Sequence, residues 1–532
     1  MDGLFTMPSR TSQKYDSIAA SVMTLADEMY GLLARTFPVC CYSDEFYFFP
    51  QVVVDEIDWR LWDDFSPDRV EDVSRKLARW VLELDALGSG DACPGDLIDI
   101  SLLIHLAVTL REQLEEVRFH RTQPTFHLAI VTAGLLQAME SGEPSALEMR
   151  FWGLDKFLET SGNILVDVPA LFRELGVEMV RDTLDWVASL GDQNGVRDSA
   201  LQAIENFGKR LGGLQVRESF LLPRDLVERI ASHHMAVGLS VDEILAEMTE
   251  ERESLLVELS TLGEELKPGA SLMDAYNGIP QVPIPREGKS KLLFQEIERL
   301  RGHCLELGLL PRDLAEGCPV KIRAVPQSMT PVRAADSYSA LPGHPPAGGT
   351  FFVYGEGSLG KASGCIHPVF RMTAAHETYP GHHFLDISRW NLSDVVRRPI
   401  ERPVFYEGWA CFAEELMEQS GFFGQRWDRF ILSFRRLRHT IRGIADLDLH
   451  MGRMDIEGVA GILTEAGFSA PRAMATARKY SLRPAYQMCY TVGLNRFRSL
   501  LGGRNRTETV CMAGRILRQG EIGFDELGRT LR

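Results

Sequence analysis

Apolar residues recur at steps of three and four along most of this sequence, and no other feature constrains its fold as strongly. The spacing is clear in four segments, 70–86, 97–113, 201–211 and 241–262. Side chains three and four residues apart lie on one face of an α-helix, so each segment offers an apolar stripe to a core. We therefore predict a large, mainly α-helical protein.

Two short segments depart from this pattern. Residues 320–325 (VKIRAV) alternate apolar and basic side chains, as a half-buried strand does, and residues 351–354 (FFVY) are a second strand candidate. Between them, residues 342–349 (PGHPPAGG) are typical of a loop or turn. We expect a small β-sheet here, with 351–354 as an edge strand along which an extended peptide pairs.

A run of Pro and Gly residues between 268 and 285 predicts a long connection. We place a boundary there, between a helical N-terminal part (1–270) and a C-terminal part (285–532) that holds the chemistry. The two parts can also form one continuous domain around a cleft. The acidic segment 242–265 is rich in Leu and Glu, and it fits a solvated helix packed on the core better than a partner-binding coiled coil.

The charge balance and the cysteines bear on partners and location. The net charge of −17 argues against binding to nucleic acid or anionic membranes, because both require concentrated basic surfaces. No stretch approaches the ~18 apolar residues of a membrane span, and the polar residues 1–14 do not resemble a signal peptide. The nine cysteines have no C-x-x-C spacing, which indicates buried thiols in a reducing compartment. We expect a cytoplasmic protein, and the oligomeric state stays open.

The string HETYPGHH, residues 376–383, carries the chemistry. A neutral imidazole such as that of His376 is a good zinc ligand, and the adjacent carboxylate of Glu377 can accept a proton from activated water. In the common signature H-E-x-x-H the second histidine follows four residues after the first, on the same helix face. Position 380 is proline here, so that signature fails as written.

The second ligand must therefore come from His382 or His383. On a straight helix His382 points away from His376, whereas His383 points back but lies roughly 10 Å along the axis. Pro380 and Gly381 interrupt a helix, so a local distortion can bring one of these histidines into place. Spacing alone also fits two histidines that cap a helix end at the surface.

A third ligand is expected on a neighbouring helix. Residues 406–419 (YEGWACFAEELMEQ) have strong helical character and contain Glu407, which follows His382 at a distance that allows a turn and a new helix. Glu414 lies on the same helix face, as a rival ligand or as a partner that orients a histidine. Both acids also fit a solvated helix face, although Glu407 has no charged neighbours.

HETYPGHH followed by YEGWACFAEE resembles the bacterial family catalogued as domain of unknown function 885, whose members carry H-E-x-x-P-G-H and then E-G-W-A. The resemblance implies a relative of the gluzincin metallopeptidases, mainly helical enzymes whose zinc is held by two His and one Glu. It implies the ligands His376, His382 and Glu407 for one zinc ion per chain, with another divalent transition metal as an alternative. His383 and Glu414 are then rival ligands or supporting partners.

Two further segments are similar to this family, 438–450 (RHTIRGIADLDLH) and 479–493 (KYSLRPAYQMCYTVG). The matching positions are Arg442, Asp446, His450, Pro484, Tyr490 and Gly493. This chain departs from the family at 447–448, where Thr-Gly is Leu-Asp, and at 485–486, where Gly-Gln is Ala-Tyr. We expect both departures to border the cleft and to change the substrate. Asp446 is kept as a further rival ligand or supporting partner.

These residues predict a zinc-dependent hydrolase that cleaves a peptide or amide bond in a small substrate. Glu377 is the expected general base. Tyr490, together with His450 or Arg442, is expected to donate a hydrogen bond to the oxyanion.

Three other hypotheses stay open. The first is a zinc or iron enzyme of another reaction class that acts on a small amino-acid-derived metabolite. The second is a catalytically inactive metal-binding homologue, and the third is an interaction scaffold that uses the acidic segment 242–265.

Overall fold

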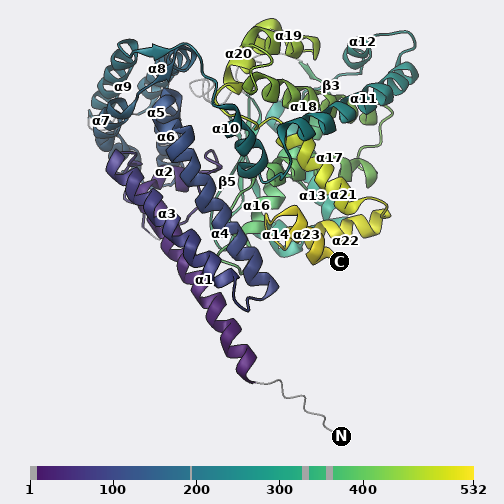
Figure 1. Ribbon diagram of the computed structural model, residues 1–532. Coiled ribbons are helices and arrows are strands. Elements are labelled where there is room, and N and C mark those ends of the chain that lie inside the picture. The colour runs from purple at the N-terminus through teal and green to yellow at the C-terminus, as the bar shows by residue number, and fades with distance from the viewer. Residues whose placement is uncertain (1–8, 55, 192–194, 326–334, 355–363) are drawn as a thin grey trace.

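The computed structural model describes residues 9–54, 56–191, 195–325, 335–354 and 364–532. Within these ranges the chain is mainly α-helical, as predicted, and only small sheets accompany the helices. Helices of the first 212 residues lie side by side on one flank, and the helices from residue 224 onward form the other (Figure 1).

The first flank begins with the long helix α1 and ends with α9. Its helices are α1 (Ser9–Thr36), α2 (Pro38–Cys41), α3 (Pro67–Gly88), α4 (Pro94–Glu112), α5 (Phe119–Thr122), α6 (Pro124–Glu140), α7 (Ala146–Ile164), α8 (Ala170–Ser189) and α9 (Val196–Gly212). A π-helical turn, Gln113–Val117, continues α4, and the strands β1 (Val168–Pro169) and β2 (Val216–Arg217) pair in parallel. The three helical segments predicted before residue 212 are confirmed as α3, α4 and α9.

Helix α3 shows why this part of the sequence is helical. Proline at its first position supplies a preset φ without losing a needed hydrogen bond. The residues it buries, Val73, Leu77, Trp80 and Leu84, follow one another at steps of four, three and four. The apolar stripe therefore faces the neighbouring helices α1 and α4.

The second flank contains the remaining helices. They are α10 (Arg224–Arg229), α11 (Val241–Leu266), α12 (Leu272–Asn277), α13 (Lys289–Glu306), α14 (Arg312–Gly317), α15 (Phe370–Glu377), α16 (His382–Trp390), α17 (Pro403–Gln419), α18 (Asp428–His450), α19 (Ile456–Glu465), α20 (Ala470–Tyr480), α21 (Cys489–Leu501), α22 (Arg506–Leu517) and α23 (Phe524–Leu531), with a π-helical turn at Ile230–His234. The acidic segment 242–265 forms most of α11. This helix packs along α18 and buries Ile244, Met248, Leu255 and Leu259, so it is a core-packed helix, as favoured from the sequence.

The predicted connection at 268–285 is more ordered than a loop. It contains the short helix α12, whose first turn is capped by the Ser271 hydroxyl, an acceptor for the Asp274 amide at 3.1 Å. It also contains β3 (Val282–Pro283), which pairs antiparallel with β7 (Cys365–Ile366). The prediction of a long connection took no account of local capping, which allows a short helix within a Pro- and Gly-rich stretch.

The small sheet before the motif is confirmed, but the predicted strand at 351–354 does not lie at its edge. Its strands are β4 (Val320–Ala324), β5 (Ser337–Ala340) and β6 (Gly349–Val353), in the order β4-β6-β5. Strand β6 is parallel to β4 and antiparallel to β5, so it is the central strand. The expectation that 351–354 is an edge strand was wrong. The two edge strands are β4, which was predicted, and β5 (SYSA), which was missed because its side chains show no clear apolar alternation.

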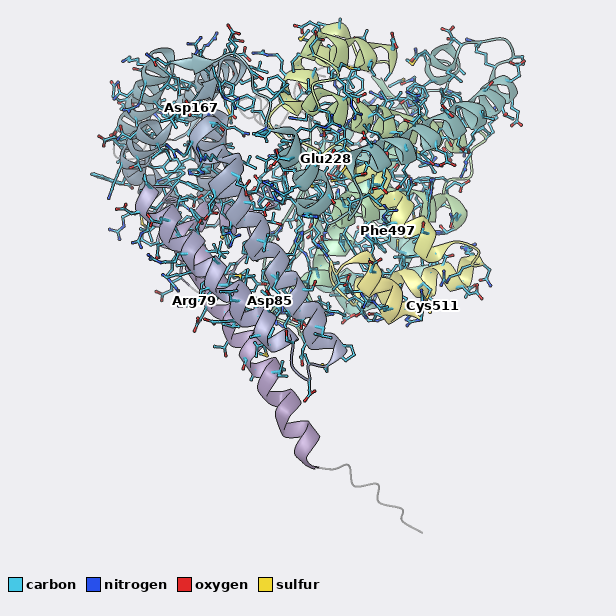
Figure 2. The ribbon with its side chains drawn as sticks, in the orientation of Figure 1. Arg79, Asp85, Asp167, Glu228, Phe497 and Cys511 are labelled. Atoms are coloured by element: carbon cyan, nitrogen blue, oxygen red, sulfur yellow. The ribbon has the colours of Figure 1, made fainter. Side chains whose placement is uncertain are left out.

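The largest cluster of buried apolar side chains extends from Ile18 in α1 to Leu531 in α23. Side chains fill the spaces between the ribbons on both flanks; Phe497, labelled in Figure 2, is fully buried in this cluster. The boundary between the parts 1–270 and 285–532 stays a prediction.

Two features bear on the expected location. Within the described ranges, no helix is both long enough and apolar enough to cross a membrane. All nine cysteines are free thiols and six of them are buried, as the sequence indicated; Cys511 is one of the two exposed (Figure 2).

Candidate metal centre

The motif HETYPGHH forms two helices and not one. Helix α15 ends at Glu377 and α16 begins at His382, with residues 378–381 as the turn between them. A side chain at Gly381 would place its Cβ 1.8 Å from the backbone oxygen of His376, so only glycine allows this close approach. The turn removes the straight-helix geometry that would have separated His376 from His382.

The second motif, EGWA, holds this turn in place. Trp409 lies on α17, and its indole Nε1 donates a 2.8 Å hydrogen bond to the backbone oxygen of Pro380. Helix α17 also packs against α21 through two glycines, Gly408 and Gly493. A Cβ on Gly408 would lie 2.5 Å from the backbone of Gly493, and bulkier residues would force the helices apart. The two sequence motifs therefore form one packed unit.

This unit brings the three predicted ligands together. The Nε2 atoms of His376 and His382 each lie 3.4 Å from Oε2 of Glu407, and all three side chains are buried. In a tetrahedral site with zinc bonds of 2.0–2.1 Å, ligand atoms are separated by about 3.3–3.4 Å. Oε2 of Glu407 has no hydrogen-bond partner among the described residues, which is costly for a buried carboxylate unless a cation is bound. The donor set and its spacing fit one zinc ion.

Glu414 supports this cluster from behind. Nδ1 of His376 donates a 2.8 Å hydrogen bond to Oε1 of Glu414, which leaves Nε2 directed at Glu407. Nε of Arg435 donates to both carboxylate oxygens of Glu414, at 3.0 and 2.9 Å. A carboxylate that orients a ligating histidine in this way is common around zinc. Cys411 lies close enough to form a second possible ligand group with His376 and Glu414, but Arg435 already neutralises that carboxylate.

His382 and His383 have different surroundings. The ring of His382 stacks on that of Tyr406 at 4.0 Å, and the Tyr406 hydroxyl donates to Asp386 at 3.0 Å. His383 points away from the cluster: its Nδ1 accepts from the Tyr338 hydroxyl at 3.1 Å and its Nε2 donates to the Cys318 carbonyl at 3.1 Å. Both ring nitrogens of His383 are therefore satisfied by the protein. Burial lowers the pKa of His383 to about 3, so it is neutral.

Glu377 is the last residue of α15 and lies beside the ligands. Its Oε2 accepts a 3.1 Å hydrogen bond from the backbone amide of Tyr338, on the free edge of β5. Burial raises the pKa of Glu377, although the nearby His376 and His382 lower it. A carboxylate whose pKa is raised toward neutrality is a better proton acceptor than an exposed one.

The charged groups of the cluster shift the pKa values of their neighbours. Burial alone would raise the pKa of Glu407, but His376 and His382 hold it well below its usual range. Burial would likewise lower the pKa of His376, but Cys411 and the two glutamates beside it raise it well above its usual range. The carboxylates therefore favour positive charge in the centre of the cluster.

Tyr486 is a site residue that sequence reasoning did not assign. Its hydroxyl donates a 2.8 Å hydrogen bond to Oε1 of Glu407, the oxygen that does not face the histidines. The residue before it, Ala485, has a φ of 64°, a left-handed conformation that favours glycine. This explains why the family has Gly at position 485. The departure at 485–486 was noted in the sequence, but nothing there connected Tyr486 with Glu407.

Tyr490 and Arg442 lie at the edge of the cluster. The Tyr490 ring is 6.3 Å from that of His376 and stacks at 4.5 Å on His439. Burial, and next the Glu407 carboxylate, raise the pKa of Tyr490 well above its usual value, so its hydroxyl stays a donor. Cζ of Arg442 lies 5.1 Å from the Tyr490 ring centroid. The sequence did not indicate that His439 stacks on Tyr490, because the segment similar to the family matches at Arg442 and not at His439.

The structure does not bring His450 or Asp446 to the cluster. His450 lies eleven residues beyond His439 on α18, about 16 Å along the axis. Its Nε2 donates to the Tyr480 carbonyl at 3.0 Å, and Asp446 accepts from the Gln487 amide at 2.9 Å. These two residues hold the segment 480–487 that carries Tyr486. The structure therefore does not support His450 as an oxyanion donor or Asp446 as a rival ligand.

The departure at 447–448 also lies elsewhere than predicted. Leu447 is fully buried in the core, and Asp448 pairs with Arg453 at 3.6 Å. These contacts of the two residues do not involve the cluster, whereas the departure at 485–486 reaches it through Tyr486.

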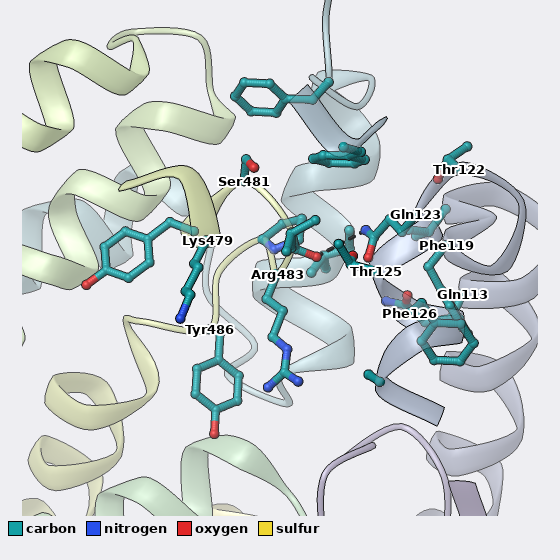
Figure 3. A pocket seen from close by; sticks show the side chains of 18 of the residues that line it. Gln113, Phe119, Thr122, Gln123, Thr125, Phe126, Lys479, Ser481, Arg483 and Tyr486 are labelled. Atoms are coloured by element: carbon teal, nitrogen blue, oxygen red, sulfur yellow. Dashed lines mark hydrogen bonds between the residues drawn. The ribbon is translucent and has the colours of Figure 1, made fainter. Parts of the chain in front are cut away.

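A cavity of about 460 Å³ lies on the far side of Tyr486 from the ligands. Residues from the first flank, such as Phe119 and Phe126, form one wall, and the segment 479–487 forms the other (Figure 3). His376, His382 and Glu407 do not line this cavity.

The fold is shared with solved bacterial proteins of unknown function. One from Shewanella oneidensis, described as a "putative lipoprotein of unknown function", matches with a TM-score of 0.70 and 14% identity over 96% of this chain and 99% of its own. Another, described as a "putative lipoprotein" from Colwellia psychrerythraea, matches with a TM-score of 0.69 and 14% identity over 97% and 98%. At such identities the likeness shows the fold alone.

The sequence itself defines the family. Residues 193–508 match the family described as bacterial protein of unknown function (DUF885), and this chain belongs to that family. No curated protein matches the sequence. The word lipoprotein describes the two structural neighbours, and the cytoplasmic location of this chain stays a prediction.

Proposed function

We propose that this protein is a zinc-dependent hydrolase that cleaves a peptide or amide bond in a small substrate. The observation that carries the proposal is the convergence of His376, His382 and Glu407 at the spacing of a tetrahedral site, beside the buried carboxylate of Glu377. Two helices that supply H-E and H, followed by a helix that supplies Glu, support a gluzincin-type relationship.

The roles of the residues follow from their positions. A zinc ion held by His376, His382 and Glu407 would act as a Lewis acid toward water and the scissile carbonyl. Glu377 accepts the proton of the attacking water and then delivers it to the leaving amine. Tyr490, whose hydroxyl stays protonated, donates a hydrogen bond to the oxyanion that develops on the carbonyl.

A second candidate uses the same ligands for another reaction. Two histidines and one carboxylate with open positions also form the facial triad of iron(II) oxygenases. Such an enzyme would act on a small amino-acid-derived metabolite. Metal identity separates the two: iron bound in preference to zinc, with oxygen-dependent turnover, would favour the alternative.

The proposal is tested by metal analysis with His376→Ala and a matched control. Wild-type protein is expected to retain about one zinc per chain, and His376→Ala is expected to lose it with an unchanged helical circular dichroism spectrum. His439→Ala, which removes a neighbouring buried histidine on α18 that does not reach Glu407, is the control and should keep its zinc. Undiminished zinc in His376→Ala contradicts the assignment.

A further inference from the structure

The cavity beside the metal cluster combines an apolar lining with several cationic side chains. Its lining includes seven phenylalanines: Phe46, Phe48, Phe49, Phe119, Phe126, Phe172 and Phe220. Three cationic side chains, Arg217, Lys479 and Arg483, also line it, against one acidic side chain, Glu45, among the described residues. This local excess of positive charge lies in a protein whose net charge is −17.

Among the three cations that line the cavity, Arg483 shares a contact residue, Tyr486, with the metal cluster. Its guanidinium carbon lies 5.9 Å from the ring centroid of Tyr47 and 6.0 Å from that of Tyr486. The Tyr486 hydroxyl donates to Glu407 at 2.8 Å. The Tyr486 side chain therefore lies between Arg483 and a predicted metal ligand.

Arg483 is exposed, and no acidic side chain of the described residues forms an ion pair with it. Its only hydrogen bond to a described residue is a 3.5 Å contact to the backbone oxygen of Glu45. Arg217, by comparison, donates to the backbone oxygens of Asp167 at 3.0 Å and Leu221 at 3.4 Å. A guanidinium is well suited to bind a carboxylate with two parallel hydrogen bonds. Figure 3 shows the Arg483 side chain extending from the same segment as Tyr486.

We propose that this cavity binds the carboxy-terminal residue of the substrate, with an apolar side chain among the phenylalanines and the free carboxylate on Arg483. The proposal rests on the hydrolase function proposed above and names its substrate class: short peptides or N-acylated amino acids that end in an apolar residue. The amide bond before that residue then lies on the metal side of Tyr486. Tyr486, where the family has Gln, forms the wall between the cavity and the cluster.

Binding can be measured without turnover. The probes are N-acetyl-phenylalanine, its carboxamide and N-acetyl-glycine, titrated into metal-free protein so that the carboxylate cannot bind zinc. The acid is expected to bind about tenfold more tightly than the carboxamide, because a charge-assisted hydrogen bond is lost in the amide. It is also expected to bind more tightly than N-acetyl-glycine, which lacks the apolar side chain.

Two charge-matched variants locate the carboxylate. Arg483→Gln should abolish the preference for acid over amide, whereas Lys479→Gln, which removes a positive charge from the same cavity wall, should preserve it. Equal loss in both variants, or an intact preference in Arg483→Gln, overturns the assignment of Arg483. An acid that binds no more tightly than N-acetyl-glycine overturns the apolar subsite.

The outcomes also separate this inference from the proposed function. If the carboxylate preference depends on Arg483 but zinc-loaded protein hydrolyses no peptide, the cavity assignment stands and the hydrolase proposal fails. If zinc-loaded protein removes carboxy-terminal residues and Arg483→Gln does so with unchanged KM, the hydrolase proposal stands and the cavity assignment fails.

Discussion

Adjacent histidines with different surroundings allow a matched comparison of His382→Ala with His383→Ala. Nε2 of His382 lies 3.4 Å from Glu407 and is expected to bind metal. Loss of a partner that only orients a ligand typically costs about 10–100-fold in metal affinity, so loss of a ligand itself should cost more than about 100-fold. His383 is fully buried, and the protein satisfies both of its ring nitrogens. Its replacement should leave zinc affinity within about threefold.

The stability of the metal-free proteins should show the opposite order. Removing the His383 ring leaves a cavity and frees the Tyr338 hydroxyl and the Cys318 carbonyl, which together cost about 2–4 kcal/mol. His382→Ala removes a ring with one unsatisfied nitrogen and should cost less. Zinc affinity is measured by competition with a chromophoric chelator, and stability by urea unfolding. A larger loss of zinc affinity in His383→Ala than in His382→Ala would refute the assignment of His382 as the ligand.

Three other predictions concern the support of the site and the buried histidines. Glu414→Gln should weaken zinc binding about 10–100-fold, since a neutral amide holds His376 less well; an unchanged affinity in chelator competition would contradict this. Tyr486→Phe should weaken zinc binding by about tenfold and leave the thermal unfolding midpoint nearly unchanged, because it removes only the hydrogen bond to Glu407. Burial lowers the pKa of His127 to about 4, below the unfolded value of about 6.5, so its contribution to stability is complete above pH 6.5 and is lost as the pH falls toward 4. Between pH 7 and 5 the wild type should lose about 2 kcal/mol more than His127→Gln in urea unfolding, and equal losses would rule out this role.

The helices could be predicted because their burial follows simple periodicity. In α3 the residues Val73, Leu77, Trp80 and Leu84 are both the apolar residues of the pattern and the residues that the structure buries. Strand β5 could not be predicted, because Tyr338 and its polar neighbours lie at a sheet edge, where no apolar alternation is needed. Edge and central strands differ by tertiary pairing, which a single sequence does not contain.

The convergence of His376, His382 and Glu407 could be predicted because they lie in two short motifs that pack directly on each other. The remaining site residues depend on packing at longer range. Tyr486 reaches Glu407 from the segment 480–487, which Arg442, Asp446 and His450 hold against α18. A family position such as His450 therefore indicated a structural support, and its distance from the cluster could not be read from the sequence.

Glu377 is proposed to transfer a proton during hydrolysis and not merely to hold the site together. The direct test compares Glu377→Gln with wild type for zinc content and for single-turnover cleavage of a peptide from a library that the wild type hydrolyses. Glutamine preserves the size of the side chain and its contact with the Tyr338 amide, but it cannot accept the proton. We expect full zinc content and a rate reduced by about 100- to 10,000-fold. Full zinc content with an unchanged rate would contradict the role of Glu377 as the general base.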